Sequence, residues 1–490
     1  MYEKIQTMKN LNFLLIATIV CVPVHQSALA CTGFAMKDGN RVLAGFSYDH
    51  QFGAGHIYIN KRNTERQRYL LYAERPVSWV SKYGNVTFNL AGRDYPHDGM
   101  NEAGLVVLSM GLDDTRFPAP DGRPAIDELG WIQYQLDTAA SVEDVVRSME
   151  KIRISSRSIG DSHFLVVDSS GKAVVIEYPG GQVKIYRGDD LPYAILANDT
   201  YPHMLAYLKQ QKAFGGPNED KYRVGSSCCR FAGVASRVRK YNPSDGPMTD
   251  YALGILNDVR QSNSRYQVVY DILNRSILYR SFNSTEVKTI RFSEMDFDCA
   301  TPALMAEIQS TNQGDPGKGF YAYDVNRSRE ALVAFNRKAV GYLPMETLVS
   351  LAETPAQSKC LTQAAPASAS GLVASLKPPT ESRIVVSNGA DNVVLDFGVK
   401  LDRAATADVD FAFEVPYDSA LVPGDNVFIA PNPVRIGRGS ESVTAKAIII
   451  TGRLKAGADA RLIVNLLSPE AAIGNEKQFT VLARRESAAK

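Results

Sequence analysis

Cys31 is the residue of this 490-residue chain whose position points most directly to chemistry. It follows Ala28-Leu29-Ala30, which has the A-x-A pattern of a signal-peptidase cleavage site. Cleavage after Ala30 makes Cys31 the first mature residue, with a thiol and a free α-amino group. Because the ordinary pKa of an α-amino group is about 7.7–8.0, that amine can act as a general base near neutral pH. One residue can then supply both nucleophile and base, so no separate histidine is required.

The residues before Cys31 have the features of a secretory signal peptide, which we predict to span 1–30. Lys4 and Lys9 precede an apolar run from Leu11 to Val24. This run has 14 residues and contains Pro23, so it is short for a bilayer span. We expect a protein of the periplasm or a secreted protein, with no membrane span.

Two other interpretations of Cys31 stay open: a chance position and a lipidation site. A bacterial lipoprotein has a Leu-like residue three positions before its cysteine, with small residues between. Here Ala28 stands three positions before Cys31 and the bulky Leu29 two positions before it. This order favours ordinary cleavage over lipid anchoring.

The charge balance excludes some classes of function. The chain has 54 Lys+Arg and 53 Asp+Glu, of which 52 and 52 remain once residues 1–30 are removed. A neutral chain lacks the basic surface that nucleic-acid or polybasic membrane binding needs. Its 45% hydrophobic content excludes disorder, and its length predicts two domains with accessory segments.

Residues 31–363 are expected to form a mixed α and β domain around Cys31. Thr32–Lys37 and Arg41–Asp49 are strand-like and are joined by Asp38-Gly39-Asn40, which favours a hairpin, so Cys31 should begin an edge of a sheet. Two helices are predicted, from Ile126 to Thr138 and after a Ser141 N-cap. Further strands are expected at 56–61, 86–91, 105–112, 164–167, 173–178, 182–186, 266–272 and 276–282.

The C-terminal part has a different composition. Residues 364–380 are rich in Ala, Ser and Pro and are predicted to be a linker. In residues 381–490, short alternating runs are separated by Gly, Asn, Asp and Pro, which predicts a small β-sandwich. It loosely resembles Calx-β and other immunoglobulin-like accessory domains, and no cluster of acidic residues argues for calcium.

Several sequence words in residues 31–300 occur in the order found in one enzyme family. The chain resembles the choloylglycine hydrolases, N-terminal-nucleophile enzymes that include penicillin V acylases and bile-salt hydrolases. The resemblance implies an α+β Ntn-hydrolase fold, an αββα four-layer sandwich. The words that carry it are Cys31-Thr-Gly-Phe34, Gly45-Phe-Ser-Tyr-Asp49, Ile59-Asn-Lys-Arg62, Trp79-Val-Ser-Lys-Tyr-Gly84, Gly99-Met-Asn-Glu-Ala-Gly-Leu105, Asp161-Ser-His-Phe-Leu-Val-Val-Asp168, Ile195-Leu-Ala-Asn198, Cys229-Arg-Phe231 and Tyr266-Gln-Val-Val-Tyr-Asp271.

The resemblance implies roles for four residues. Cys31 matches the nucleophile that forms a thioester, and Asp49 matches the aspartate that orients the terminal amine; its charge would also raise the pKa of that amine. Asn198 matches an asparagine near the tetrahedral intermediate, where an amide N–H can stabilise developing negative charge. Arg230 matches an arginine beside Phe that stabilises charge in the site, with Arg237 as the alternative if the alignment slips.

The chain departs from the family pattern at two places. Phe46 stands where many members have Arg, so a positive charge that could favour the thiolate is missing. The segment Ser109-Met-Gly-Leu112 stands where some members have an oxyanion Asn or Tyr, so a backbone N–H would have to substitute for that side-chain donor.

The remaining cysteines and histidines give weaker predictions. Cys299 and Cys360 could form a disulfide in an oxidising compartment, while the vicinal pair Cys228-Cys229 cannot be assigned. The chain has six histidines without paired spacing, so neither a metal nor a cofactor is expected.

The sequence thus predicts an exported hydrolase of linear amide C–N bonds in small N-acyl substrates, such as penicillin V, conjugated bile acids or acyl-homoserine lactones. The alternative is a lipid-anchored, catalytically silent binding protein of the same fold, with Cys31 acylated. A homo-oligomer remains open.

Overall fold

The computed structural model describes residues 30–68, 70, 74–219, 225–311, 319–340, 343–361, 372–380, 382–386, 392–405, 409–415, 427–450, 454, 459–467, 472–473 and 476–485. The predicted signal peptide, apart from Ala30, lies outside the described residues. Ala30 still precedes Cys31 in this chain. Among the described residues, no helix combines the length and the apolar character that a membrane crossing requires.

The first sheet of the N-terminal part carries Cys31 at its start. The predicted hairpin is confirmed, with Thr32 opposite Ser47 and Asp38 opposite Arg41. The prediction of an edge position is wrong, because β1 also pairs with β14 through Gly33 and Phe34. The strand order is β14 (Ile195–Leu196), β1 (Thr32–Asp38), β2 (Arg41–Asp49), β15 (Ser264–Asp271), β16 (Ser276–Ser281) and β17 (Lys288–Arg291).

The second sheet has nine strands, and its central strands are buried on both faces, whereas the terminal strands Lys184–Tyr186 and Tyr321–Ala322 are partly exposed. Along β11, Leu165 and Val167 belong to the apolar core that the two sheets share, while Phe164 and Val166 belong to the core under the helices α1 and α2. This alternation follows from the two-residue period of a strand. The order is β13 (Lys184–Tyr186), β12 (Ala173–Glu177), β11 (Ser162–Val167), β8 (Val106–Gly111), β7 (Pro96–Asn101), β6 (Asn85–Asn89), β3 (His56–Asn60), β18 (Leu304–Glu307) and β19 (Tyr321–Ala322).

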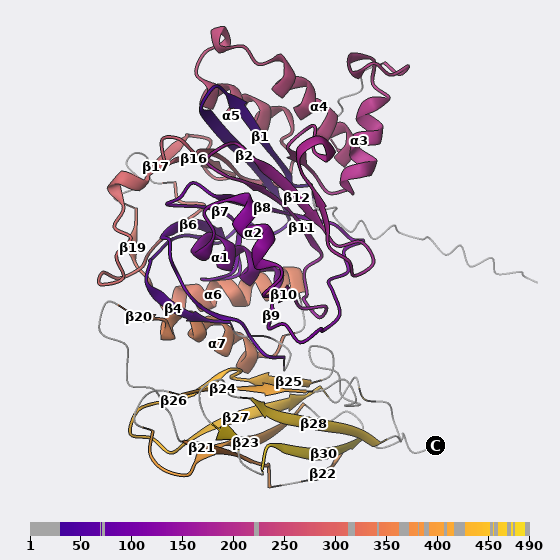
Figure 1. The fold of residues 1–490 in the computed structure, drawn as a ribbon. Helices are drawn as coiled ribbons and strands as arrows, with labels where there is room; N and C mark the ends of the chain where they lie inside the picture. The colour runs from indigo at the N-terminus through magenta and orange to yellow at the C-terminus, as the bar shows by residue number, and fades with distance from the viewer. Residues whose placement is uncertain are drawn as a thin grey trace, which may run out of the picture.

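Helices cover the outer faces of both sheets, which gives the predicted four layers (Figure 1). The helix α1 (Glu128–Thr138) begins after an Asp127 cap and packs on β7, and α2 (Val142–Ser148) begins after the predicted Ser141 cap. On the other side, α4 packs on β1 and α5 on β2 and β15. This side is formed by α3 (Tyr201–Lys209), α4 (Ser227–Lys240) and α5 (Met248–Asp258).

Two short sheets and a disulfide complete the N-terminal part. The predicted disulfide between Cys299 and Cys360 is present. It lies where β20 (Lys359–Cys360) pairs with β4 (Thr64–Gln67), and β4 pairs in turn with β5 (Ser78–Val80). The other short sheet joins β9 (Ala125–Ile126) and β10 (Arg153–Ile154).

The C-terminal part is the predicted all-β sandwich, built around its own apolar core. Its strand β21 already lies within the residues predicted to be linker. One sheet has the order β25 (Val427–Ala430), β27 (Ser442–Ile449), β23 (Val393–Leu401), β21 (Val373–Lys377) and β29 (Ala472–Ile473). The other has the order β22 (Arg383–Val386), β30 (Gln478–Arg485), β28 (Asp459–Leu467), β24 (Val409–Glu414) and β26 (Val434–Ile436).

Two further helices, α6 (Val325–Phe335) and α7 (Met345–Glu353), lie between the sheets of the N-terminal part and the sandwich (Figure 1). The helix α6 continues into a π-helical turn, Asn336–Val340. The helix α7 packs on β25 of the sandwich.

Candidate active site

The thiol of Cys31 is buried where the β1–β2 hairpin opens. Because Thr32 pairs with Ser47, the residue before β1 lies beside the last residues of β2. The Cys31 Sγ donates to the backbone carbonyl of Asp49 over 3.7 Å, and the residue is only 3% exposed. Burial, reinforced by the negative charge of Asp49, raises the pKa of the thiol to about 12, although Arg230 opposes the shift. With Ala30 still attached, this thiol is therefore protonated at neutral pH.

The carboxyl group of Asp49 lies at the end of β2, and only one of its two oxygens accepts hydrogen bonds among the described residues. Its Oδ1 accepts hydrogen bonds from Ser47 Oγ, at 2.9 Å, and from Ser264 Oγ on the neighbouring strand β15. Its Oδ2 is buried and has no hydrogen-bond partner among the described residues. Burial raises the pKa of Asp49 to about 6, against the two serine hydrogen bonds, which lower it. A buried carboxylate oxygen without a hydrogen bond destabilises the folded protein, and a further donor at this oxygen would remove that cost.

Arg230 joins the start of β1 to the segment that follows β14. Its guanidinium donates to Thr32 Oγ1 at 2.9 Å, to the Cys31 carbonyl at 3.4 Å and to Asn198 Oδ1 at 3.0 Å. The amide of Asn198 in turn donates to the carbonyl of Gly111 at 2.9 Å, at the end of β8. These contacts fix the orientation of both side chains.

The structure thus brings together all four residues predicted from the sequence, Cys31, Asp49, Asn198 and Arg230. The positive charge of Arg230 acts on both Cys31 and Asp49 and lowers the pKa of each. Burial in turn lowers the pKa of Arg230 from its ordinary value. The alternative arginine, Arg237, instead forms an exposed ion pair with Asp258. Of the two arginines, Arg230 is therefore the one that contacts Cys31 and Asn198, and its role in catalysis stays a prediction.

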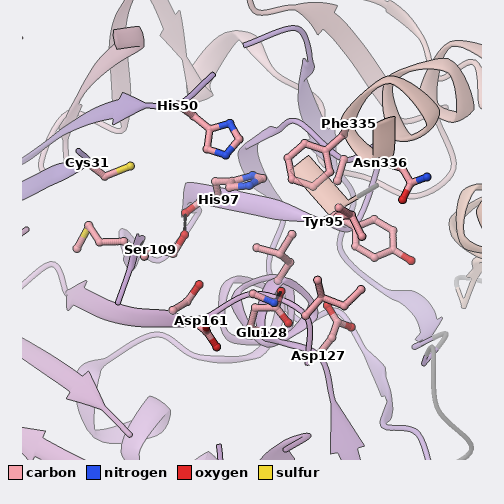
Figure 2. Close-up of a pocket in the computed structure, with 18 of the residues that line it drawn as sticks. Cys31, His50, Tyr95, His97, Ser109, Asp127, Glu128, Asp161, Phe335 and Asn336 are labelled. Carbon is pink, nitrogen blue, oxygen red and sulfur yellow. Dashed lines mark hydrogen bonds between the residues drawn. The ribbon is translucent and has the colours of Figure 1, made fainter. Parts of the chain in front are cut away.

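The two departures from the family pattern have different structural outcomes. Phe46 is fully buried in the core between the sheets, where its ring meets the edge of Tyr266 at 6.4 Å, so no charge replaces the missing arginine at that position. Ser109 Oγ donates to the carbonyl of His97 at 2.7 Å, which ties β8 to β7 (Figure 2).

A cavity of about 310 Å³ opens from Cys31 and runs toward α6 and α7. Figure 2 shows Cys31 at one end, Asn336 and Tyr95 toward the other, and three acidic side chains along one side; between the two ends the rings of His50 and Phe335 stack with centroids 6.3 Å apart. The volume is at the lower end of the range typical of small-molecule sites, roughly 300–1,000 Å³. Of the four predicted residues, Cys31 alone lines this cavity.

The sequence interpretation missed a buried group of polar side chains around Asp98, whose charge also acts on the Cys31 thiol. Asp98 on β7 accepts hydrogen bonds from Tyr266, at 2.5 Å, and from Tyr270. Burial raises the pKa of Asp98 to about 7, although both tyrosine hydrogen bonds lower it. Tyr48 stacks on Tyr266 with ring centroids 5.1 Å apart. Only the spacing of Tyr266 and Tyr270, which places both on one face of a strand, signals this group in the sequence.

One group of side chains has the composition of a metal site. Ligand atoms of Asp199, His203 and Cys228 lie within 4.8 Å of one another. His203 Nδ1 is 2.8 Å from Asp199 Oδ2, and Cys228 Sγ is 3.6 Å from the same oxygen. These mutual hydrogen bonds satisfy the three side chains without an ion, so we do not assign a metal centre. Neither Cys228 nor Cys229 forms a disulfide.

Comparisons with known proteins agree with this geometry. Residues 31–226 match the model of the linear amide C–N hydrolases, choloylglycine hydrolase family. The chain is 26% identical over 184 residues to a penicillin V acylase of Pectobacterium atrosepticum, an alignment that covers 34% of this chain and 48% of the relative. The chain therefore spans about half the length of the curated relative it matches.

Two solved structures are similar to the N-terminal part to different degrees. The penicillin V acylase of Agrobacterium tumefaciens has a TM-score of 0.51 and 24% identity, over 60% of this chain and 98% of that one. A variant of the conjugated bile acid hydrolase of Clostridium perfringens has a TM-score of 0.45 and 17% identity, over 60% and 96%. The first of these shares the fold of the N-terminal part, and the match over residues 31–226 confirms the resemblance drawn from the sequence.

Proposed function

We propose that this chain, with its match to the linear amide C–N hydrolases, cleaves the amide bond of small N-acyl substrates with Cys31 as the nucleophile. The proposal includes export and removal of residues 1–30, which gives Cys31 a free α-amine. The candidate substrates are penicillin V, conjugated bile acids and acyl-homoserine lactones. The first two appear in the names of proteins similar to this chain.

The unpartnered Oδ2 of Asp49 is the observation that carries the proposal. Cleavage before Cys31 turns its backbone nitrogen into an ammonium group next to this carboxylate, and the pair satisfies both groups. The new positive charge also lowers the pKa of the thiol from the value near 12 that it has while Ala30 is attached. Removal of the signal peptide is therefore the step that activates the nucleophile.

The reaction has two steps. The ammonium group first releases a proton to solvent; the neutral α-amine then takes the thiol proton, Sγ attacks the acyl carbonyl, and a C–S bond forms. The C–N bond then breaks as the leaving amine takes that proton. In the second step the α-amine removes a proton from water, the hydroxide attacks the thioester, and the C–S bond breaks to release the carboxylate and regenerate the thiol.

Asn198 and Arg230 support these steps from outside the covalent chemistry. The Asn198 amide has two N–H groups, and one of them donates to Gly111. The second can donate to the oxyanion of each tetrahedral intermediate. Arg230 holds the Asn198 oxygen and the Cys31 carbonyl, so it orients the nucleophile and the donor together.

Hydrolysis of a substrate panel tests the proposal. Mature wild type, Cys31→Ala and Cys229→Ala are each incubated with penicillin V, a glycine-conjugated bile acid and an N-acyl-homoserine lactone. Cys229 forms no disulfide and does not line the cavity, so it serves as the matched control. We expect wild type and Cys229→Ala to hydrolyse at least one of the three and Cys31→Ala to hydrolyse none. Equal rates for wild type and Cys31→Ala would reject Cys31 as the nucleophile.

A further inference from the structure

The far wall of the cavity comes from residues beyond the segment that matches the family. The wall consists of Leu332 of α6, Leu351 of α7 and Leu343 before α7, which line the cavity and share an apolar cluster with Tyr95, away from Cys31. The side chain of Asn336 pairs in both directions with the backbone of Leu343, at 3.3 and 3.4 Å, and so ties the end of α6 to the start of α7. These two hydrogen bonds fix the end of α6 relative to the start of α7.

The lining has little positive charge to offer a ligand. Among the described residues that line the cavity, none is Lys or Arg. Burial lowers the pKa of His97 to about 3 and also lowers that of His50, so both rings are neutral at neutral pH. The carboxylate of Asp127 is paired with Arg68, which lies behind it. An anionic group at the far end would find no cation there and would lose its hydration.

The wall rests directly on the sandwich. Along β25 and β27, alternate residues face opposite ways: Phe428 and Ile448 belong to one apolar cluster with the cavity residues Leu332 and Leu351, whereas the neighbouring Ile449 belongs to the sandwich core. The two-residue period of a strand thus presents one face to the sandwich interior and the other to α7. The position of α7 depends on this outer face.

We propose that α6 and α7 form an acyl-binding subsite, which takes the uncharged apolar acyl chain of the substrate, and that the β-sandwich sets its depth. The inference rests on the proposed function and specifies its substrate class. The acyl group remains bound to Cys31 after the amine departs, so it is the part of the substrate that can contact the apolar wall formed by α6 and α7.

An acyl-length series tests the subsite. Substrates share one neutral amine and carry acyl chains from butanoyl to tetradecanoyl. While the chain still lengthens into the cavity, each added methylene should raise kcat/KM about fourfold, which corresponds to about 0.8 kcal/mol. Beyond the length that reaches the wall, kcat/KM should fall. A chain that ends in a carboxylate should lose at least tenfold relative to the methyl-ended chain of equal length.

Variants of the wall and of the sandwich separate the two parts of the inference. Leu351→Ala, with Leu351→Val as a milder change in case the first misfolds, should move the optimum to longer chains. Ile448→Ala should move it in the same direction. The matched control is Ile449→Ala, the same substitution one residue along β27 on the opposite face, which should lower stability but leave the optimum unchanged.

The outcomes are distinguishable from failure of the proposed function. If wild type hydrolyses the series but its optimum stays fixed in Leu351→Ala, Leu351→Val and Ile448→Ala, the subsite is wrong. If wild type hydrolyses none of them, the proposed function fails, and calorimetric titration of Cys31→Ala with the octanoyl amide then decides the subsite. Binding that Leu351→Ala alters supports the subsite, and no binding overturns it.

Discussion

Burial raises the pKa of both Cys31 and Asp49 while Ala30 is attached, and the negative charge of Asp49 adds to the shift of the Cys31 thiol. The thiol has a pKa near 12, and the carboxyl group has a pKa near 6. On the proposed mechanism, an ammonium group created at Cys31 by cleavage would oppose both shifts, because an opposite charge favours the ionised form of each. That charge is the partner that the buried Oδ2 of Asp49 lacks among the described residues while Ala30 is attached.

Replacement of Asn198 tests the proposed oxyanion donor. Asn198→Ala removes an amide held by Arg230 and Gly111, so we expect kcat to fall about 10²-fold with a smaller change in KM. Steady-state kinetics with the best substrate of the panel measures this. A rise in KM at unchanged kcat would mean that Asn198 binds the ground state and is not a transition-state donor.

Asp98 gives a prediction about pH and stability. Its folded pKa, about 7, lies above the ordinary value of 3.8, so the folded protein keeps this proton to a higher pH than the unfolded chain does. Stability should therefore fall as pH rises from about 4 to about 7. In Asp98→Asn this decrease should be smaller, because there is no proton to lose.

Thermal unfolding of wild type and Asp98→Asn at pH 5 and pH 7.5 checks this. The exposed Asp189→Asn serves as the control, since an exposed carboxyl group carries no burial cost. Identical pH dependence in wild type and Asp98→Asn would contradict the prediction.

At the residue scale, the four site residues could be predicted because ordered sequence words carried them. Ser264 and the Tyr266–Asp98 contact could not, since they depend on the pairing of β15 with β2 and on the packing of two sheets. Asp98 and Tyr266 are 168 positions apart in the chain, and no local pattern relates them.

Local signals were sufficient for some elements. The turn around Gly39, which has a φ of 56°, and the caps Ser141 and Asp127 mark the ends of elements that the structure confirms. The edge position of β1 was wrong because its second partner is the two-residue strand β14, too short to leave a sequence pattern. The helices α3 to α7 were missed.

The disulfide is an element-scale prediction. It fastens β20, which follows α7, to the region of Asn63 and β4, and closes a loop with a sequence separation of 61. A loop of that length predicts a stabilisation of about 3–4 kcal/mol. Cys299→Ser/Cys360→Ser should lose this amount in denaturant unfolding, whereas the Cys229→Ser control should lose little. An unchanged midpoint would show that other contacts hold β20.

At the scale of the whole molecule, the sequence predicted two domains but not that they share an apolar cluster. In the sequence, the alternating residues of β25 and β27 predict only two strands. The fold shows that α7 covers their outer face. The cavity wall could not be predicted for the same reason, since it combines helices near residue 340 with strands from the first hundred residues.

This shared cluster predicts coupled unfolding. We expect one cooperative thermal transition for wild type in scanning calorimetry. Phe428→Ala removes a large buried side chain between α7 and β25, should cost about 3–5 kcal/mol and should separate the sandwich transition from the rest. Two well-separated transitions already in wild type would contradict coupling.

The central claim is that Cys31 becomes an N-terminal nucleophile, and peptide mass spectrometry tests it most directly. The exported protein is mixed with an N-acyl substrate, quenched in acid during turnover and digested. The predicted result is an N-terminal peptide that begins at Cys31, has a free α-amine and carries one acyl group from the substrate on its thiol. An N-terminal Cys31 that bears a lipid anchor, or turnover without any acyl group on Cys31, would contradict the claim.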